Sequence, residues 1–172
     1  MCAVQVVNTL TGYSLGVFGL LPRTIVGLPG IVTSPFLHGS WLHLIGNLLP
    51  FGVLSLMVCS DGLRRYVAVS ATVILVGGGL VWVFGRGAYH VGASGWVFGL
   101  WVYVLARAWF QHSWGNLFTA LVALVFYSGM LYGFIPRYGV SFESHIAGAL
   151  AGYWAARTFA TAPRRVTPKK ES

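Results

Sequence analysis

The chain has 172 residues, of which 56% are hydrophobic and only 8% are charged. A soluble domain carries about 25% charged residues, so this composition excludes an ordinary soluble globular protein. The net charge of +8 does not predict nucleic-acid binding, because the basic residues form no face interleaved with aromatic side chains. Four of them lie together after the last apolar segment: Arg164, Arg165, Lys169 and Lys170.

Long apolar segments separated by short polar breaks predict an all-α membrane protein with six transmembrane helices. The expected spans are residues 2–20, 41–59, 66–84, 94–110, 116–135 and 145–161. Together they form one membrane domain over residues 1–161, followed by a disordered basic tail over residues 162–172. Such a tail is typical of a segment held near an anionic cytoplasmic leaflet, so membrane lipid is an expected partner.

The distribution of Lys and Arg predicts the orientation. With loops on alternating sides, eight basic residues fall on one side and three on the other. Cytoplasmic loops carry the excess of basic residues, so we expect a multi-pass plasma-membrane protein with both termini in the cytoplasm. The outward-facing loops then carry Arg23, Arg86 and Arg137.

The second span opens with polar side chains. His43 and Asn47 are four residues apart and share one helical face, and His38 precedes them. An imidazole and an amide inside a bilayer are costly unless they have partners or a function. Acyl transfer needs donors aimed at a developing oxyanion, and this pair can supply them. Polar packing between helices is the alternative interpretation.

The fourth span begins with a serine between glycines, Gly92-Ala93-Ser94-Gly95. On its own this short pattern is weak, and a small-residue contact between helices would explain it equally well. The sixth span begins with His145, which in isolation would be a helix cap or an interfacial residue. Neither Ser94 nor His145 predicts a catalytic site alone; only the two together do.

Pairs of glycines in the two spans could bring Ser94 and His145 together. Gly95 and Gly99 are four apart in the fourth span, as are Gly148 and Gly152 in the sixth. Such pairs let two helix backbones approach closely in lipid. If the glycine faces pack together, Ser94 comes within reach of His145. Serine would then be the nucleophile, and histidine the general base that later protonates the leaving amine.

Helix lengths place the polar groups at one depth. Ser94, His145 and Asn47 lie twelve to fourteen residues, or about 18–21 Å of helix, before a charged residue at the inner end of their spans. Those charged residues are Arg107, Arg157 and Asp61. In a hydrocarbon core about 30 Å thick, all three groups then lie roughly 10 Å below the outer surface.

The scarcity of acidic residues narrows the chemistry. The acids are Asp61, Glu143 and Glu171, so an intramembrane aspartyl dyad cannot be built. There is no H-E-x-x-H motif, which argues against a zinc protease, and we expect no metal and no cofactor. Glu143 lies two residues before His145 and is interpreted as a solvated charge. A Ser–His dyad is the economical prediction.

These residues resemble the rhomboid intramembrane serine proteases, and the resemblance covers the chain from about residue 20 to 160. The matching pieces are His38-x4-His43-x3-Asn47, Gly92-Ala93-Ser94-Gly95 and His145-x2-Gly148-x3-Gly152. The resemblance implies a six-helix rhomboid-like bundle. It also implies that Ser94 is the nucleophile, that His145 is the base, and that His43, Asn47 and the Ser94 amide form the oxyanion hole.

The resemblance further implies single-span membrane proteins as substrates, cut near the outer end of a helix weakened by small or helix-breaking residues. His38 matches a position that is structural rather than catalytic. Phe98 matches a position where an aromatic ring, often a tyrosine, packs on the catalytic histidine. The sequence departs from many members in lacking a Trp-Arg pair in the first loop, where Pro22-Arg23 stands instead.

Two other classes of function compete with an intramembrane endopeptidase. A catalytically silent rhomboid-like or derlin-like scaffold would bind transmembrane segments without cutting them, but loss of Ser94 or His145 would be its signature and both are present. A small-solute transporter usually relies on buried acids or broken helices at mid-membrane. The predicted spans contain no acidic residue.

Overall fold

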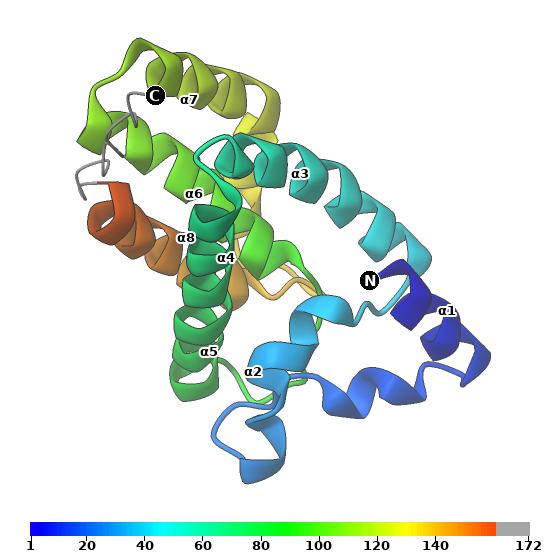
Figure 1. Cartoon of the computed structure of the whole chain (residues 1–172). Helices are drawn as coiled ribbons and strands as arrows, with labels where there is room; N and C mark the ends of the chain where they lie inside the picture. Colours follow the sequence, from blue (N-terminus) through cyan, green and yellow to red (C-terminus); the bar gives the residue numbers. More distant parts are fainter. Residues whose placement is uncertain (161–172) are drawn as a thin grey trace, which may run out of the picture.

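Helices make up the fold in the computed structural model, which describes residues 1–160 (Figure 1). The α-helices are α1 (Cys2–Leu10), α2 (Gly30–Thr33), α3 (Trp41–Cys59), α4 (Leu63–Thr72), α5 (Gly78–Phe84), α6 (Ser94–Gln111), α7 (Trp114–Tyr127) and α8 (Phe142–Ala155). Short 3-10 segments are η1 (Ser14–Phe18), η2 (Ile25–Gly27), η3 (Ser34–Phe36) and η5 (Ser128–Phe134), and π-helical turns are η4 (Val73–Gly77) and η6 (Ala156–Ala160). The predicted tail, residues 162–172, lies outside the described residues.

Five of the predicted spans correspond to helical segments whose ends lie within three residues of the expected ones. The π-helical turn η4 joins α4 and α5 into one rod, and η5 and η6 extend α7 and α8 in the same way. The start of α3 has a local cause, because the Ser40 side chain accepts the backbone N–H of His43 at 3.1 Å. Serine at this position satisfies one of the free N–H groups of the first turn.

Within residues 1–160, three helical segments are long and apolar enough to cross a membrane by length and composition: Trp41–Cys59, Leu63–Phe84 and Trp114–Phe134. The structure therefore supports a helical membrane protein, but it does not establish the count of six spans. Only 11% of the Trp114–Phe134 window is buried inside the protein. This segment lies at the periphery, where its apolar side chains would face lipid.

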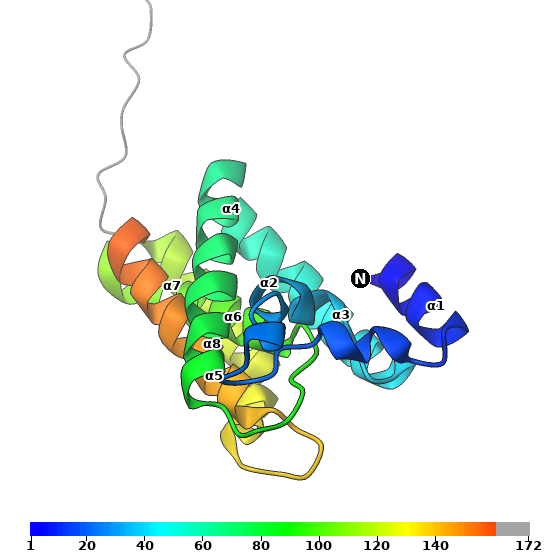
Figure 2. The same ribbon diagram turned by 90° about the horizontal axis from the view of Figure 1, so that it is seen from below.

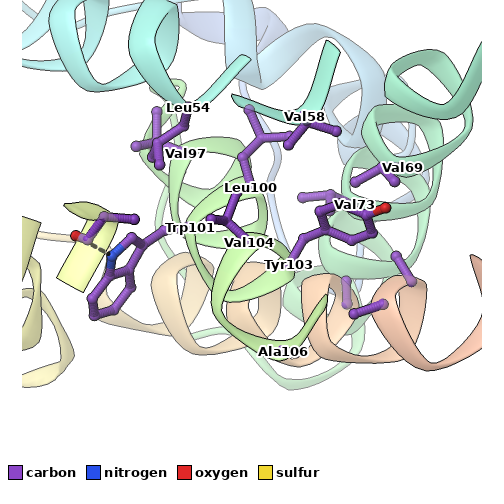
Figure 3. Close-up of a cluster of buried hydrophobic side chains, with 14 residues drawn as sticks. Leu54, Val58, Val69, Val73, Val97, Leu100, Trp101, Tyr103, Val104 and Ala106 are labelled. Carbon is purple, nitrogen blue, oxygen red and sulfur yellow. Dashed lines mark hydrogen bonds between the residues drawn. The ribbon is translucent and has the colours of Figure 1, made fainter. Parts of the chain in front are cut away.

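The helix α6 runs through the interior of the bundle (Figure 1). Nine of its eighteen residues are buried. Figure 3 shows its side chains Val97, Leu100 and Val104 among those of α3 and α4, including Leu54 and Val69. Because protein rather than lipid surrounds α6, its sequence does not need to be as apolar as that of a peripheral span.

The first predicted span, residues 2–20, is wrong. The helix α1 ends at Leu10, and Gly12 and Tyr13 then take left-handed backbone conformations. Nine residues reach only about 14 Å, which is half of a bilayer core. Polar groups explain the early end, because the Asn8 side chain accepts the backbone N–H of Leu15 at 3.1 Å and donates to the His38 carbonyl at 3.2 Å. Figure 2 shows α1 at the edge of the molecule, beside the start of α3.

The helices α6 and α8 are in contact through their glycines. A methyl group on Gly148 would overlap the carbonyl oxygen of Gly95, and one on Gly152 would overlap that of Gly99. Backbone thus meets backbone at both positions, as expected for small residues between membrane helices. No side chain larger than hydrogen fits at Gly148 or Gly152 without moving α6.

A buried ion pair closes the end of the bundle opposite Ser94. The Arg107 guanidinium is 2.6 Å from the Asp61 carboxylate, and it also donates to the Thr119 hydroxyl at 3.1 Å. Arg107 is 1% exposed, so this side chain does not reach out to the lipid surface. Arg107 and Asp61 were both expected to mark the inner edge of the membrane. Their pairing means that these two charges lie at the same level in the bundle.

We expect Gly152→Ala to lower the free energy of unfolding by about 1–3 kcal/mol, because the added methyl group overpacks the α6–α8 contact. The matched control is Gly52→Ala in α3, where the added methyl would meet no atom within 4 Å. That control should be neutral or stabilising by about 0.5–1 kcal/mol. Thermal unfolding in detergent measures both variants. Equal stability of the two variants would contradict a tight α6–α8 contact.

Candidate active site

Ser94 and His145 lie together at one end of the bundle. Ser94 is the first residue of α6, and His145 is in the first turn of α8. The Ser94 Oγ is 2.8 Å from the His145 Nε2, and His145 is 7% exposed. The contact of Gly95 with Gly148 lies directly behind this pair. The two sequence motifs therefore meet as the glycine spacing predicted.

The other ring nitrogen of His145 determines the tautomer. The His145 Nδ1 is 2.7 Å from the carbonyl oxygen of Gly133 in η5. A carbonyl can only accept a hydrogen bond, so Nδ1 carries the proton and Nε2 faces Ser94 with a lone pair. In this arrangement the Ser94 hydroxyl donates to Nε2. A neutral imidazole oriented in this way can remove the proton of the serine.

Gly133 was not identified from the sequence. A methyl group at this position would lie 2.5 Å from the Phe98 Cζ and 3.0 Å from the His145 Nδ1. Only a glycine lets this backbone carbonyl approach the imidazole so closely. The available signal was Gly129-x3-Gly133 within an otherwise apolar span, which has the same spacing as the two pairs that did guide the prediction.

Phe98 stacks on the histidine ring. The two rings are parallel, with an interplanar angle of 0° and centroids 4.2 Å apart. Phe98 lies one turn after Ser94 in α6, so the helix that carries the serine also supports the imidazole. Phe98 itself is held edge-on by Phe134 at 5.0 Å. The imidazole plane is thereby fixed from one face, while Gly133 fixes its rotation.

A cavity of about 870 Å³ lies over this pair and is lined by Ser94, His145, His43 and Asn47. The Asn47 Nδ2 donates to the His43 carbonyl at 2.8 Å. A side-chain amide has two N–H groups, so one remains to serve a ligand. The structure therefore brings all four predicted residues to one cavity.

The His43 ring packs against Gly92. A methyl group on Gly92 would lie 2.6 Å from the His43 Cε1, and the φ angle of Gly92 is +117°. Both the space and the backbone conformation therefore require glycine here. Gly92 supports the His43 side of the cavity and the turn that leads into Ser94.

His38 lies outside this cavity. It is 1% exposed, and its Nε2 accepts the backbone N–H of Ala93 at 3.3 Å. Its ring meets that of His43 edge-on, with centroids 5.1 Å apart. His38 thus supports the residue before Ser94 and the ring of His43 without facing the cavity.

Comparison with known proteins identifies the family of the chain. The family model for the rhomboid domain matches residues 27–162. The chain belongs to the rhomboid family. Similar proteins include an uncharacterised protein of Mycobacterium tuberculosis (strain ATCC 25618 / H37Rv), 32% identical over 179 residues, which cover 98% of this chain and 75% of that protein. Another is an uncharacterised protein of Mycobacterium leprae (strain TN), 33% identical over 180 residues, covering 98% of this chain and 71% of that protein.

One acidic residue of this rhomboid differs from its prediction. Glu143 was interpreted as a solvated charge, but its side chain is only 15% exposed and its carboxylate is 3.2 Å from the Arg86 guanidinium. Arg86 also donates to the Val140 carbonyl, and its guanidinium lies over the Phe142 ring. Local sequence patterns could not predict this ion pair, because 57 residues separate Arg86 from Glu143.

Burial of His38 predicts a pH dependence of stability. His38 precedes the first residue of α3, and burial, with His43 nearby, lowers its pKa from 6.5 to about 4. The unfolded chain therefore binds a proton at His38 between pH 6.5 and 4 while the native state does not. Stability from this residue is complete above pH 6.5 and is lost as the pH falls, by about 2–3 kcal/mol.

The variant His38→Gln tests this assignment, because its amide oxygen can still accept the Ala93 N–H but does not titrate. We expect the free energy of unfolding, measured in detergent from pH 7 to 4, to fall more steeply in the wild type than in this variant. The other histidines are common to both proteins, so the difference between the two profiles reports on His38 and its contact with His43. Parallel pH profiles would show that His38 is not the buried neutral group.

Proposed function

We propose that this rhomboid is an intramembrane serine endopeptidase, which hydrolyses peptide bonds in or near transmembrane helices of single-span membrane proteins. One observation carries the proposal: the Ser94 Oγ lies 2.8 Å from the His145 Nε2, whose partner Nδ1 is fixed on a carbonyl. A hydroxyl that donates to a neutral, oriented imidazole is the arrangement that nucleophilic catalysis requires.

In the proposed reaction the Ser94 Oγ attacks the scissile carbonyl carbon while the His145 Nε2 takes the hydroxyl proton. The tetrahedral intermediate carries a negative oxygen. His145 then gives its proton to the leaving amine, and the carbon–nitrogen bond breaks. A water molecule, activated by the same nitrogen, hydrolyses the acyl-enzyme and restores Ser94.

The proposed oxyanion donors come from two helices. Asn47 and His43 line the cavity from α3. The Ser94 backbone N–H belongs to the first turn of α6, where N–H groups have no intrahelical acceptor and the helix dipole favours negative charge. Donors fixed before the reaction stabilise charge that develops only in the transition state.

We propose a topology in which the Ser94 end of the bundle faces outward. Arg64 and Arg65 are at the start of α4 and Arg107 is near the end of α6, opposite Ser94. The excess of basic residues favours this end as the cytoplasmic one. The crossings would be α3, α4–α5, α6, α7–η5 and α8–η6, since the eighteen residues of α6 reach about 27 Å. The C-terminal end is then cytoplasmic. In this proposed topology α1 lies at the outward end, because Asn8 bonds to His38 near Ser94. The proposal therefore keeps only the C-terminal half of the expectation that both termini are cytoplasmic.

The central test uses purified protein in liposomes with a panel of helical transmembrane substrates. We expect Ser94→Ala and His145→Ala each to reduce cleavage by at least about 10³-fold, and a fluorophosphonate probe to label the wild type at Ser94. Ser70→Ala is the matched control, because it removes a buried serine hydroxyl of α4 that does not line the cavity. It should retain full activity.

Different outcomes separate the candidate functions. Cleavage that persists unchanged in Ser94→Ala would refute the dyad. A wild-type protein that binds transmembrane segments but neither cuts them nor reacts with the probe would instead be a rhomboid-like scaffold.

The Asn47 amide is tested separately. We expect Asn47→Ala to lower kcat by about 10²–10³-fold with little change in KM, because the donor acts on charge formed in the transition state. The control is Asn116→Ala, which removes an amide bonded to Gln111 near the opposite end of α6. A rise in KM at constant kcat would show that Asn47 binds substrate rather than the oxyanion.

A further inference from the structure

Two connections that precede the site residues are joined to each other. The α5–α6 connection, residues 85–93, leads into Ser94, and residues 138–141 lead into α8 and His145. His90 of the first connection bonds through its Nδ1 to the Ser141 hydroxyl of the second, and the Ser141 Oγ is 2.6 Å from the Ser144 Oγ. We name His90, Ser141 and Ser144 the polar relay.

The hydrogen bonds of the relay have a definite direction. The His90 Nε2 is 3.1 Å from the Arg86 carbonyl oxygen, so this nitrogen carries the proton and Nδ1 accepts. Ser141 therefore donates to His90, and its oxygen remains free to accept from Ser144. Each member of the relay has a partner in the neutral tautomer of His90, so its geometry is well defined.

The relay is anchored at both of its ends. The backbone of His90 pairs with Leu20 in an antiparallel bridge, with N–H to O distances of 3.0 and 2.8 Å. Ser144 packs on α6, because a methyl group on Gly95 would lie 3.0 Å from the backbone carbonyl oxygen of Ser144 and 3.4 Å from its Cβ. His90 is four residues before Ser94, and Ser144 directly precedes His145.

The ion pair described above reinforces the same junction. Arg86, at the start of the α5–α6 connection, contacts Glu143, Val140 and Phe142, which all belong to the entrance of α8. The glycine contacts hold α6 to α8 along the interior of the bundle. Near the cavity, where the two helices begin, the relay and the ion pair hold the same two helices together.

We propose that His90 is a positioning residue, which acts through Ser141 and Ser144 to hold Ser94 and His145 at reacting distance. This inference rests on the proposed endopeptidase function. His90 borders the cavity but is only 4% exposed, so it offers little surface to a substrate. A misplacement of about 1 Å in a catalytic pair can cost about 10²-fold in rate, which gives a small displacement at the relay a large effect.

The test separates the two ring nitrogens of His90. His90→Asn places an amide where Nδ1 stood and can still accept from Ser141. His90→Gln places its amide at the Nε2 position and retains only the bond to Arg86. We expect His90→Gln and Ser141→Ala to lower kcat by about 10-fold or more with KM changed less than about twofold. His90→Asn should stay within about threefold of the wild type.

A second measurement reports on the dyad without a helical substrate. The rate of Ser94 labelling by a small fluorophosphonate should fall in parallel with kcat in His90→Gln and Ser141→Ala. Thermal unfolding in detergent verifies that each variant is folded, and Ser141, which is partly exposed, offers the milder change if His90→Gln is unstable.

The matched control is Arg23→Met. Arg23 donates to the carbonyls of Val83 and Gly85, so this variant loosens the same α5–α6 connection without touching the entrance of α8. It should retain the wild-type kcat. An equal loss in Arg23→Met would mean that general loop stability, not the relay, controls the rate.

Two further outcomes would overturn the assignment. Equal kcat in the wild type, His90→Gln and Ser141→Ala would remove any role for the relay while leaving the proposed function intact. An increase in KM with an unchanged labelling rate would make His90 a cavity-shaping residue. Absence of labelling and cleavage in the wild type itself would refute the proposed function, and the positioning role with it.

Discussion

The contact of α6 with α8 through glycine is the constraint on which the rest of the structure depends. Lipid tails are as apolar as leucine side chains, so burial of apolar surface cannot draw two membrane helices together as it does in water. Close backbone approach supplies dispersion contacts instead, and Gly148 and Gly152 permit it by overlying the carbonyls of Gly95 and Gly99. Ser94 and His145 lie at the end of this α6–α8 contact that faces the cavity. The backbone contacts therefore determine how far apart the two helices lie, and the side chains near the cavity act within that limit.

A polar site in an apolar bundle also requires that its members have partners. The His145 Nδ1 has the Gly133 carbonyl, and Asn47 has the carbonyl one turn before it. His38 accepts from Ala93. In each case a side chain is paired with a backbone group, which lowers the cost of burying a polar group in an apolar bundle. The same bonds orient the groups, so stability and preorganisation of the site have one cause.

The sequence predicted those features that depend on local pattern. Apolar runs gave the bounds of α3 and α6, and glycine spacing gave the meeting of Ser94 with His145. Features that depend on tertiary contacts were not predicted from the sequence. The end of α1 at Leu10 depends on Asn8 reaching Leu15 and His38, and a hydropathy pattern contains no such information. The partners of His145 and Glu143, which are Gly133 and Arg86, come from distant segments and follow only from the packed fold.

Within residues 1–160, the ring nitrogens of His145 are bonded to the Gly133 carbonyl and the Ser94 hydroxyl and to no carboxylate, which has a consequence for the proposed mechanism. In a conventional triad a carboxylate orients the imidazole and stabilises the imidazolium that forms. Here the Gly133 carbonyl orients the ring as a neutral dipole, and Glu143 is engaged by Arg86. A carboxylate buried beside His145 would itself need costly desolvation.

Stabilisation of a transient imidazolium must then come from elsewhere. The Phe98 ring lies parallel to the imidazole at 4.2 Å, and a cation over an aromatic face gains about 0.5–2 kcal/mol. Because Phe98 has no hydroxyl, its contribution is limited to this stacking and to the exclusion of water. In the proposed mechanism the larger part of the transition-state stabilisation would therefore act on the oxyanion rather than on the imidazolium, through the proposed donors of α3 and the first turn of α6.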